Sequence, residues 1–248
     1  KIVTKHVPGI QVFGGIVLNW SGGGLNPHAV DAAILMGAKI VWLGNMHAGT
    51  LSSKPFYSQY NWHNLPHNHT LKTRSIKKWM VAPPVNLIDL ETGELVPVMF
   101  DILDLIADAG DVILNTCHIS FQECSVVVPA AKKAGVDRIM IDHAHRFTIE
   151  QQQKLASMSA YLEYDIPKDE SKHRDIAEFI KIIGAQKCVI TSGMGAATHC
   201  HPIDEMRHIM MSLRMNGISE KEVDLMTKIT PAALLSLDEA PRPFRGYI

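Results

Sequence analysis

The chain has 248 residues, of which 46% are hydrophobic and 20% are charged, the composition of an ordinary globular protein with a sizeable core. Its 24 basic and 25 acidic side chains nearly cancel, so charge gives no reason to expect nucleic acid or an anionic membrane as a partner. No apolar run approaches the ~18 residues of a membrane span, no secretory leader is visible, and the four cysteines lack CxxC spacing, so we expect a cytoplasmic protein with reduced thiols.

Short apolar segments alternate with amphipathic ones along the first half of the chain. Asn26 is suited to cap a helix whose first turn contains Pro27. A long irregular stretch follows the second strand and runs to about residue 82, which is too long for an ordinary connection. In chain order we predict a strand at 11–18, a helix at 26–37, a strand at 39–43, a β-hairpin at 87–96 and a helix at 98–109.

The second half repeats the same alternation more regularly. Ser219, with Glu222 three residues later, is the signature of a capped helix start. We predict strands at 111–114, 137–141, 160–164 and 187–191, and helices at 120–134, 148–157, 171–183, 202–215, 219–228 and 231–237.

Strands separated by single helices indicate a parallel sheet with right-handed crossovers. Six β/α units can be counted, whereas a closed barrel of this kind has eight. We therefore predict an α/β fold, a TIM-like (β/α) barrel that lacks one or two N-terminal units in a chain beginning at Lys1 rather than Met. It would form a single domain over 1–248, with an insertion or lid at about 48–97.

The alternative is a doubly wound sheet of six strands. No GxGxxG or GxxxxGK[ST] phosphate loop opens a helix after the first strand, which is the usual mark of nucleotide-binding members of that class. The segment Ser21-Gly22-Gly23-Gly24 fits neither template and is interpreted as a turn that could contact a ligand.

Thirteen histidines exceed the roughly five that typical usage predicts for this length. In a parallel barrel the loops after the strands share one mouth, where function lies. Imidazoles that converge there with a carboxylate would suit zinc or a similar divalent ion. Histidines follow four of the six predicted strands, at His47, His118, His143 with His145, and His199 with His201.

From this placement we predict a metal site and a catalytic set. The predicted metal ligands are His118, His143 and His47, and the predicted catalytic residues are His118, His143, His145 and Glu163. The alternation of Glu163 with its apolar neighbours would turn the carboxylate into the barrel, where it is costly unless paired or bound to metal. Asp142 is a candidate for orienting a histidine.

Two further groups are weaker candidates. His63, His67 and His69 resemble a metal tract, but they lie in an irregular, aromatic-rich insertion that is more typical of a lid or a subunit contact. Cys117 has no supporting signature of a nucleophile.

The chain resembles the amidohydrolase superfamily of metal-dependent hydrolases, specifically a poorly characterised branch of it. The order and spacing of several segments carry the resemblance, which covers nearly the whole chain. Thr230-Pro231-Ala232 is similar to the motif in the helix that ends many of these barrels. The segments are VPGIQVFGGIVLN, GGLNPHAVDAAILMGAKIVW, NTCHIS, DRIMIDHAH and ISEKEVDLMTKITPAALLSLD.

The resemblance implies that His118 and His143 are the metal ligands that follow barrel strands five and six. The superfamily's His-x-His pair on strand one has no counterpart here, which fits absent N-terminal units. The aspartate expected after strand eight falls at about Ser192, and serine is a poor metal ligand and no base. Either His199 or His201 substitutes for it, or the usual hydrolytic machinery has been lost.

Three functions follow as hypotheses. The first is a metal-dependent hydrolase that cleaves a C–N bond, amide or cyclic amide, in a small molecule through metal-activated water, with zinc preferred over manganese or iron. The second is a lyase such as a decarboxylase on the same barrel, and the third is a catalytically silent ligand-binding homologue. We also expect a homo-oligomer, with the insertion or the C-terminal tail PRPFRGYI at the contact.

Overall fold

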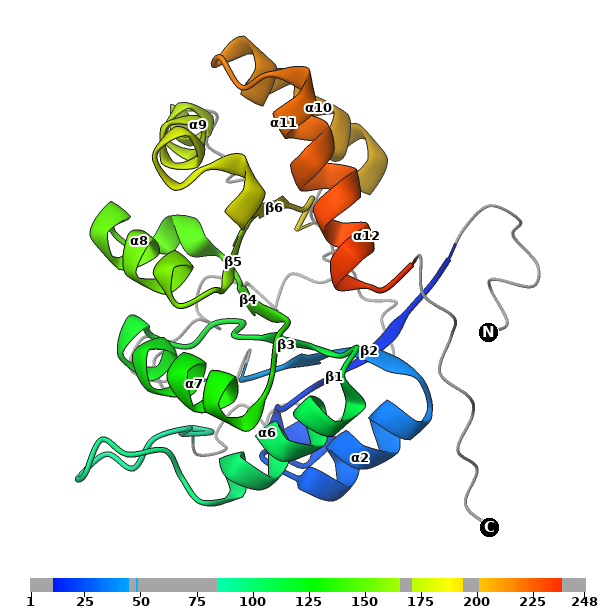
Figure 1. Cartoon of the computed structure of the whole chain (residues 1–248), viewed down its shortest axis with the longest axis vertical. Helices are drawn as coiled ribbons and strands as arrows, with labels where there is room; N and C mark the ends of the chain where they lie inside the picture. The colour runs from blue at the N-terminus through cyan, green and yellow to red at the C-terminus, as the bar shows by residue number, and fades with distance from the viewer. Residues whose placement is uncertain (1–10, 45–47, 49–83, 166–170, 194–200, 238–248) are drawn as a thin grey trace, which may run out of the picture. The chain divides into compact units, whose positions relative to one another are not determined.

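A computed structural model of the chain describes residues 11–44, 48, 84–165, 171–193 and 201–237 (Figure 1). Contacts divide the chain into two compact units, Lys1–Asp137 with Pro241–Ile248, and Arg138–Ala240. Each unit contains helices and parallel strands, so the prediction of an α/β protein with parallel strands is confirmed.

In the first unit three strands pair in the order β1-β2-β3. Val17 pairs with Trp42, and Trp42 pairs with Asn115, so the carboxyl ends of the three strands lie at one edge. The described elements of this unit are β1 (Gly14–Val17), η1 (Trp20–Gly22), α2 (Pro27–Leu35), β2 (Ala38–Trp42), α6 (Val98–Ala109), β3 (Ile113–Asn115) and α7 (Phe121–Ala134).

Local signals explain where these helices begin. Oδ1 of Asn26 accepts the N–H groups of His28 and Ala29 at 3.0 and 3.4 Å, which confirms Asn26 as the N-cap of α2. At α7, Ser120 and Glu123 form a capping box, in which Glu123 accepts from the N–H and the hydroxyl of Ser120 at 2.8 Å. The caps satisfy backbone donors that a helix start leaves without intrahelical partners.

The predicted hairpin is present in outline. Ile88 and Leu95 form an antiparallel bridge, and the carboxylate of Asp89 accepts the N–H groups of Glu91 and Thr92 at 2.9 Å to hold the turn. The segment makes this bridge without extended strands on either side. The rest of the predicted insertion, apart from residues 48 and 84–97, lies outside the described residues.

The second unit pairs β4, β5 and β6 in parallel and in chain order. Large side chains such as Leu162 and Tyr164 are fully buried in it. Its described elements are β4 (Ile139–Ile141), η3 (Ala144–Arg146), α8 (Ile149–Ser157), β5 (Tyr161–Tyr164), α9 (Ser171–Ile183), η4 (Ala185–Lys187), β6 (Cys188–Ile190), α10 (Pro202–Met215), α11 (Glu220–Asp224), η5 (Leu225–Ile229) and α12 (Thr230–Leu234).

The two helices predicted near the C-terminus are instead joined without a break. Ser219 and Glu222 form the predicted capping box at the start of α11. The chain then passes through the π-helical segment η5 into α12. Pro231 accounts for this segment, because proline lacks an N–H and its ring would clash with the carbonyl of Thr227 in a regular α-helix. The wider π turn removes that clash.

Within the described part of the chain, none of the helices has the length and the apolar character needed to cross a membrane.

Candidate active site

The register of the second unit places two acidic residues side by side. Ile141 at the end of β4 pairs with Leu162 of β5, so the next residues along each strand, Asp142 and Glu163, lie at the same level. Adjacent strands are only about 4.8 Å apart, which brings the two carboxyl groups together at the carboxyl end of the sheet. Both residues are buried, and Glu163 is 8% exposed.

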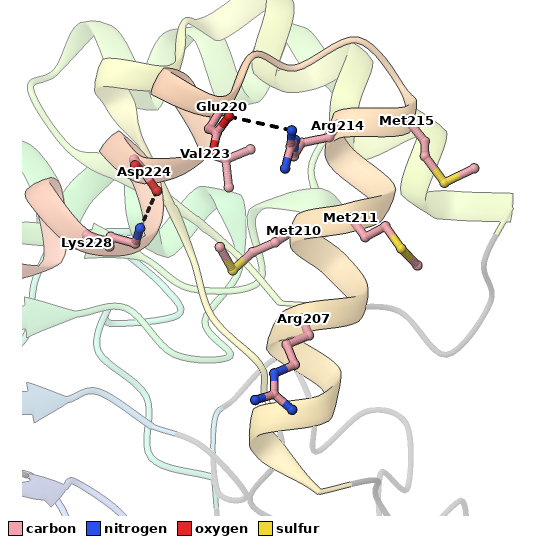
Figure 2. A pocket seen from close by; sticks show the side chains of 9 residues that line it. All are labelled: Arg207, Met210, Met211, Arg214, Met215, Glu220, Val223, Asp224 and Lys228. Carbon is pink, nitrogen blue, oxygen red and sulfur yellow. Dashed lines mark ion pairs between the residues drawn. The ribbon is translucent and has the colours of Figure 1, made fainter.

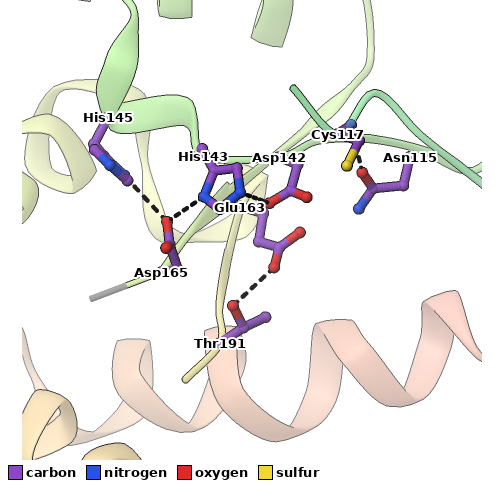
Figure 3. A network of polar contacts seen from close by, with 8 residues as sticks. All are labelled: Asn115, Cys117, Asp142, His143, His145, Glu163, Asp165 and Thr191. Carbon is purple, nitrogen blue, oxygen red and sulfur yellow. Dashed lines mark hydrogen bonds and ion pairs between the residues drawn. The ribbon is translucent and has the colours of Figure 1, made fainter. Parts of the chain in front are cut away.

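A second pairing joins the residues that follow. Nδ1 of His143 lies 2.8 Å from Oδ1 of Asp165, and Nδ1 of His145 lies 3.3 Å from the same oxygen (Figure 3). On its other side, Nε2 of His143 lies 3.7 Å from Oδ1 of Asp142. His143 therefore lies between two carboxylates. Asp165 is hydrogen-bonded to Nδ1, and Asp142 lies near Nε2.

The backbone at His143 contributes to this placement. His143 has φ of 50°, in the left-handed region that residues other than glycine seldom occupy. Such a conformation costs about 1–2 kcal/mol, so it persists only where surrounding contacts fix it. Here it turns the imidazole back toward Asp165 directly after the strand.

Gly193, from the TSGMG segment after β6, packs against Asp165. Its φ is 59°, and a Cβ added there would lie 3.0 Å from Cβ of Asp165. A larger residue would therefore be strained and would press on the carboxylate that holds His143. Glycine at this position allows the loop after β6 to approach the loop after β5.

Burial and neighbouring charges change the acidity of the cluster. Burial, and then the negative charge of Asp142, raise the pKa of Glu163 to about 8, although Thr191 opposes this by donating its hydroxyl to Oε1 at 2.7 Å. The pKa of Asp142 is also raised, mainly by burial and in part by Asp165. The protonated form of Glu163 is therefore favoured at neutral pH in the metal-free protein, and the pKa of the neighbouring Asp142 is raised as well.

The surroundings of His143 and Asp165 favour their charged forms, whereas those of Glu163 and Asp142 favour the neutral forms. Burial is the largest single effect on both His143 and Asp165 and disfavours their charged forms, but their mutual hydrogen bond and the attraction of neighbouring opposite charges together outweigh it. As a result the pKa of His143 is raised, with a further contribution from Asp142, and the pKa of Asp165 is lowered. The pair behaves as a histidine with a carboxylate that stabilises its charged form.

The structure brings together three of the residues predicted to be functional. His143, His145 and Glu163 belong to one cluster in the second unit. His118 is half-buried after β3 in the first unit, where its backbone N–H donates to the carbonyl of Gly44 at 3.3 Å. His47 lies outside the described residues.

The weaker candidates are placed as follows. Cys117 is buried with φ of 52°, and its N–H donates to Oδ1 of Asn115 at 2.7 Å. Ser192 is half-buried after β6, and His201 is exposed at the N-cap position of α10. The candidates His63, His67, His69 and His199 lie outside the described residues.

Three members of the cluster were not predicted from sequence. Asp165, Thr191 and Gly193 each follow a strand end, but nothing local marks them as partners of His143 or Glu163. Asp142 was predicted to orient a histidine, whereas the carboxylate bonded to Nδ1 of His143 is that of Asp165. Placement after a strand end, which drew attention to the histidines, was the signal that could have found them.

The donor chemistry of the cluster suits a divalent metal ion. Metal-bound histidines usually donate their second nitrogen to a carboxylate, as His143 does to Asp165. Two ligand atoms that share one ion at about 2.1 Å lie roughly 3.4–3.6 Å apart, close to the 3.7 Å between Nε2 of His143 and Oδ1 of Asp142. Among the described residues, no set of three or more such side chains is already arranged as a metal site.

Comparison with known proteins identifies a family whose function is not known. The family model described as "Family of unknown function (DUF6282)" matches residues 1–163, about two thirds of the chain. The matched region runs from the first residue to Glu163 and includes Asp142, His143 and His145. No curated protein matches the chain.

Proposed function

We propose that this chain, which belongs to the DUF6282 family, is a metal-dependent hydrolase that cleaves an amide or cyclic amide C–N bond in a small molecule. The observation that supports this best is the convergence of an oriented histidine and a proton-holding carboxyl group. His143 with Asp165, and Glu163 with Asp142, meet at the carboxyl ends of adjacent parallel strands. The resemblance of the sequence to amidohydrolases leads to the same class of reaction.

Glu163 supplies the proton that C–N cleavage needs. An amide nitrogen is a poor leaving group until it is protonated, so the site must hold an acid at neutral pH. Since Thr191 donates to Oε1 of Glu163, we place the acidic proton on Oε2. Asp142 lies beside it, and its negative charge raises the pKa of Glu163.

The cluster also has the residues to hold the metal. Nε2 of His143 and a carboxylate oxygen of Asp142 would bind the ion, and Asp165 would fix the orientation of the imidazole through Nδ1. Nitrogen and oxygen donors suit zinc first, and manganese or iron as alternatives. When bound, the ion supplies a Lewis acid that polarises the scissile carbonyl and increases the acidity of water. The sequence also predicts His118 and His47 as ligands; His118 belongs to the first unit, and His47 lies outside the described residues.

The fold supports the same proposal. Parallel strands that alternate with helices, with polar residues gathered after the strands, are the arrangement expected of a TIM-like barrel and its mouth. We propose a fold of this class for the chain. The arrangement of the cluster in the second unit follows from the pairing of β4, β5 and β6.

Hydrolysis by the full chain tests the proposal. The protein would be loaded with zinc or manganese and assayed against five- and six-membered cyclic amides, beside the variant Glu163→Gln. That variant keeps the shape of the side chain but cannot donate an acidic proton, so kcat should fall by at least about 100-fold. Glu178→Gln, on the exposed face of α9, is the matched control and should leave kcat unchanged. Equal activity of the two variants would remove Glu163 from the mechanism.

One observation favours a second candidate, a metal-dependent lyase such as a decarboxylase. Ser192 occupies the position after β6 where the resemblance implies an aspartate base. A lyase does not need to activate water, and the proton on Glu163 could instead be delivered to a carbanion. Release of carbon dioxide from a carboxylate substrate, with no oxygen from labelled water in the organic product, would favour this candidate over hydrolysis.

A further inference from the structure

The second unit has a groove that is lined by none of the residues of the proposed catalytic cluster. It is bounded by α10 on one side and by α11 with η5 on the other (Figure 2). It has a volume of about 710 Å³. Met210 points across it from α10 toward α11, where Val223 is buried. The groove therefore has an apolar floor between two helical walls.

Apolar side chains continue onto the surface beside the groove. Met211 is 58% exposed and Met215 is 80% exposed, and both lie on the outer side of α10 in Figure 2. A cluster of exposed apolar residues around a groove is a common feature of protein–protein contacts, and methionine adapts readily to the shape of a partner.

The two walls carry opposite charges. α10 contributes Arg207 and Arg214, and α11 contributes Glu220 and Asp224 (Figure 2). Arg214 and Glu220 meet across the groove at 3.6 Å, with side chains 57% and 72% exposed. An ion pair so exposed is worth little, so each of its members can exchange its partner at small cost. Lys228 pairs with Asp224 within the same turn of helix and is similarly exposed.

We propose that this groove is the contact surface between two copies of the chain related by a two-fold axis parallel to the groove. Rotation by 180° about such an axis turns the second copy to face the first and exchanges its left and right walls. The basic α10 wall of one copy then lies opposite the acidic α11 wall of the other. The same residues form both halves of the contact, as a two-fold interface requires.

The position of the ion pair along the groove agrees with this axis. A rotation about an axis along the groove keeps each residue at its own height. Because Arg214 and Glu220 lie at one height within a chain, Arg214 of one copy comes to the level of Glu220 of the other. A two-fold axis perpendicular to the groove would instead set basic wall against basic wall, which like-charge repulsion disfavours.

The charge pattern also selects against other occupants. Glu220 and Asp224 on the α11 side would repel a polyanion such as nucleic acid, although Lys228 beside Asp224 reduces this repulsion. A fitting partner must present an acidic edge to α10, a basic edge to α11 and apolar groups between them. The chain itself carries that surface.

Solution mass and charge reversal test the proposal with the full chain. Light scattering of the wild-type protein should give about twice the 27.5 kDa mass of one chain. Arg207→Glu/Arg214→Glu makes both walls acidic and Glu220→Lys/Asp224→Lys makes both walls basic, so each variant alone should have the mass of one chain. Mixed in equal amounts, they should form a one-to-one dimer, because acidic walls now meet basic walls on both sides.

Controls separate this contact from general effects of charge. Arg174→Glu/Glu178→Lys, which reverses exposed charges on α9, should remain dimeric. Circular dichroism would show whether each variant is folded. Should a charge variant fail to fold, Met211→Gln/Met215→Gln provides the test, since it should weaken the dimer without changing charge. A wild-type protein with the mass of one chain, or a mixture that does not associate, would overturn the proposal.

Discussion

Oδ1 of Asp165 lies 2.8 Å from Nδ1 of His143, and this pair joins two loops that follow adjacent parallel strands. The hydrogen bond fixes which nitrogen of the imidazole faces the protein. Nε2 is then directed toward Asp142, at 3.7 Å. The orientation of His143, and with it any chemistry at Nε2, therefore depends on a carboxylate 22 residues away along the chain.

Replacing that carboxylate should weaken metal binding without unfolding the protein. In Asp165→Asn the side chain keeps its size but loses the charge that stabilises the orientation and basicity of His143. Loss of such an outer partner lowers metal affinity by about 10–100-fold. Calorimetric titration with zinc would measure the change, and Asp175→Asn on the exposed face of α9 is the control. Equal affinities in the two variants would contradict a role for Asp165 in orienting a metal ligand.

Glu163 should make the metal-free protein less stable as pH rises. Its pKa is 4.5 in the unfolded chain and about 8 in the folded protein. Well below pH 4.5 the group is protonated in both states and has no effect on stability. Between pH 4.5 and about 8 the unfolded state ionises while the folded state retains its proton, so stability is progressively lost, by a few kcal/mol at most.

Urea unfolding in the presence of a chelator would measure this dependence. Glu163→Gln should remove the decline contributed by residue 163, so that the free energy of unfolding of the variant falls less between pH 5 and pH 8 than that of the wild type. Parallel curves for the two proteins would show that the carboxyl group is not protonated in the folded state.

The capping box at α7 should contribute measurably to stability. In Ser120→Ala the N–H of Glu123 loses the hydroxyl that accepts it at 3.1 Å, and Glu123 loses one of its own donors. The cost expected for removing an N-cap is about 1 kcal/mol. Ser157→Ala, at the last residue of α8, should change the free energy of unfolding by less than about 0.5 kcal/mol in the same urea experiment.

A substitution to glycine at the end of α8 should stabilise the protein. Ser159 is exposed and has φ of 62°, a left-handed conformation that glycine adopts without strain. The penalty that Ser159→Gly relieves is on the order of 1 kcal/mol, reduced by the greater freedom of glycine in the unfolded chain. Thermal unfolding should show a higher midpoint, and a lower one would mean that the serine makes a contact worth more than the strain.

Much of the secondary structure follows from signals within a few residues. The helices predicted at 98–109, 171–183 and 202–215 have those bounds in the structure. Periodic apolar residues and capping side chains act over three or four positions, so the sequence contains them directly. Near the C-terminus the same local signals suggested two helices, whereas Pro231 is accommodated by a π turn and the chain continues as one.

The sequence by itself determined that the protein is α/β with parallel strands, and that His143, His145 and Glu163 stand at strand ends. Only the tertiary structure decided which side chains meet there. The register of β4 against β5 places Asp142 beside Glu163 and brings Asp165 to His143. Thr191, directly after β6, then donates to Glu163. Strand register depends on contacts between residues about twenty positions apart, and a shift by one residue would turn each side chain to the opposite face. No pattern within a single segment contains that information.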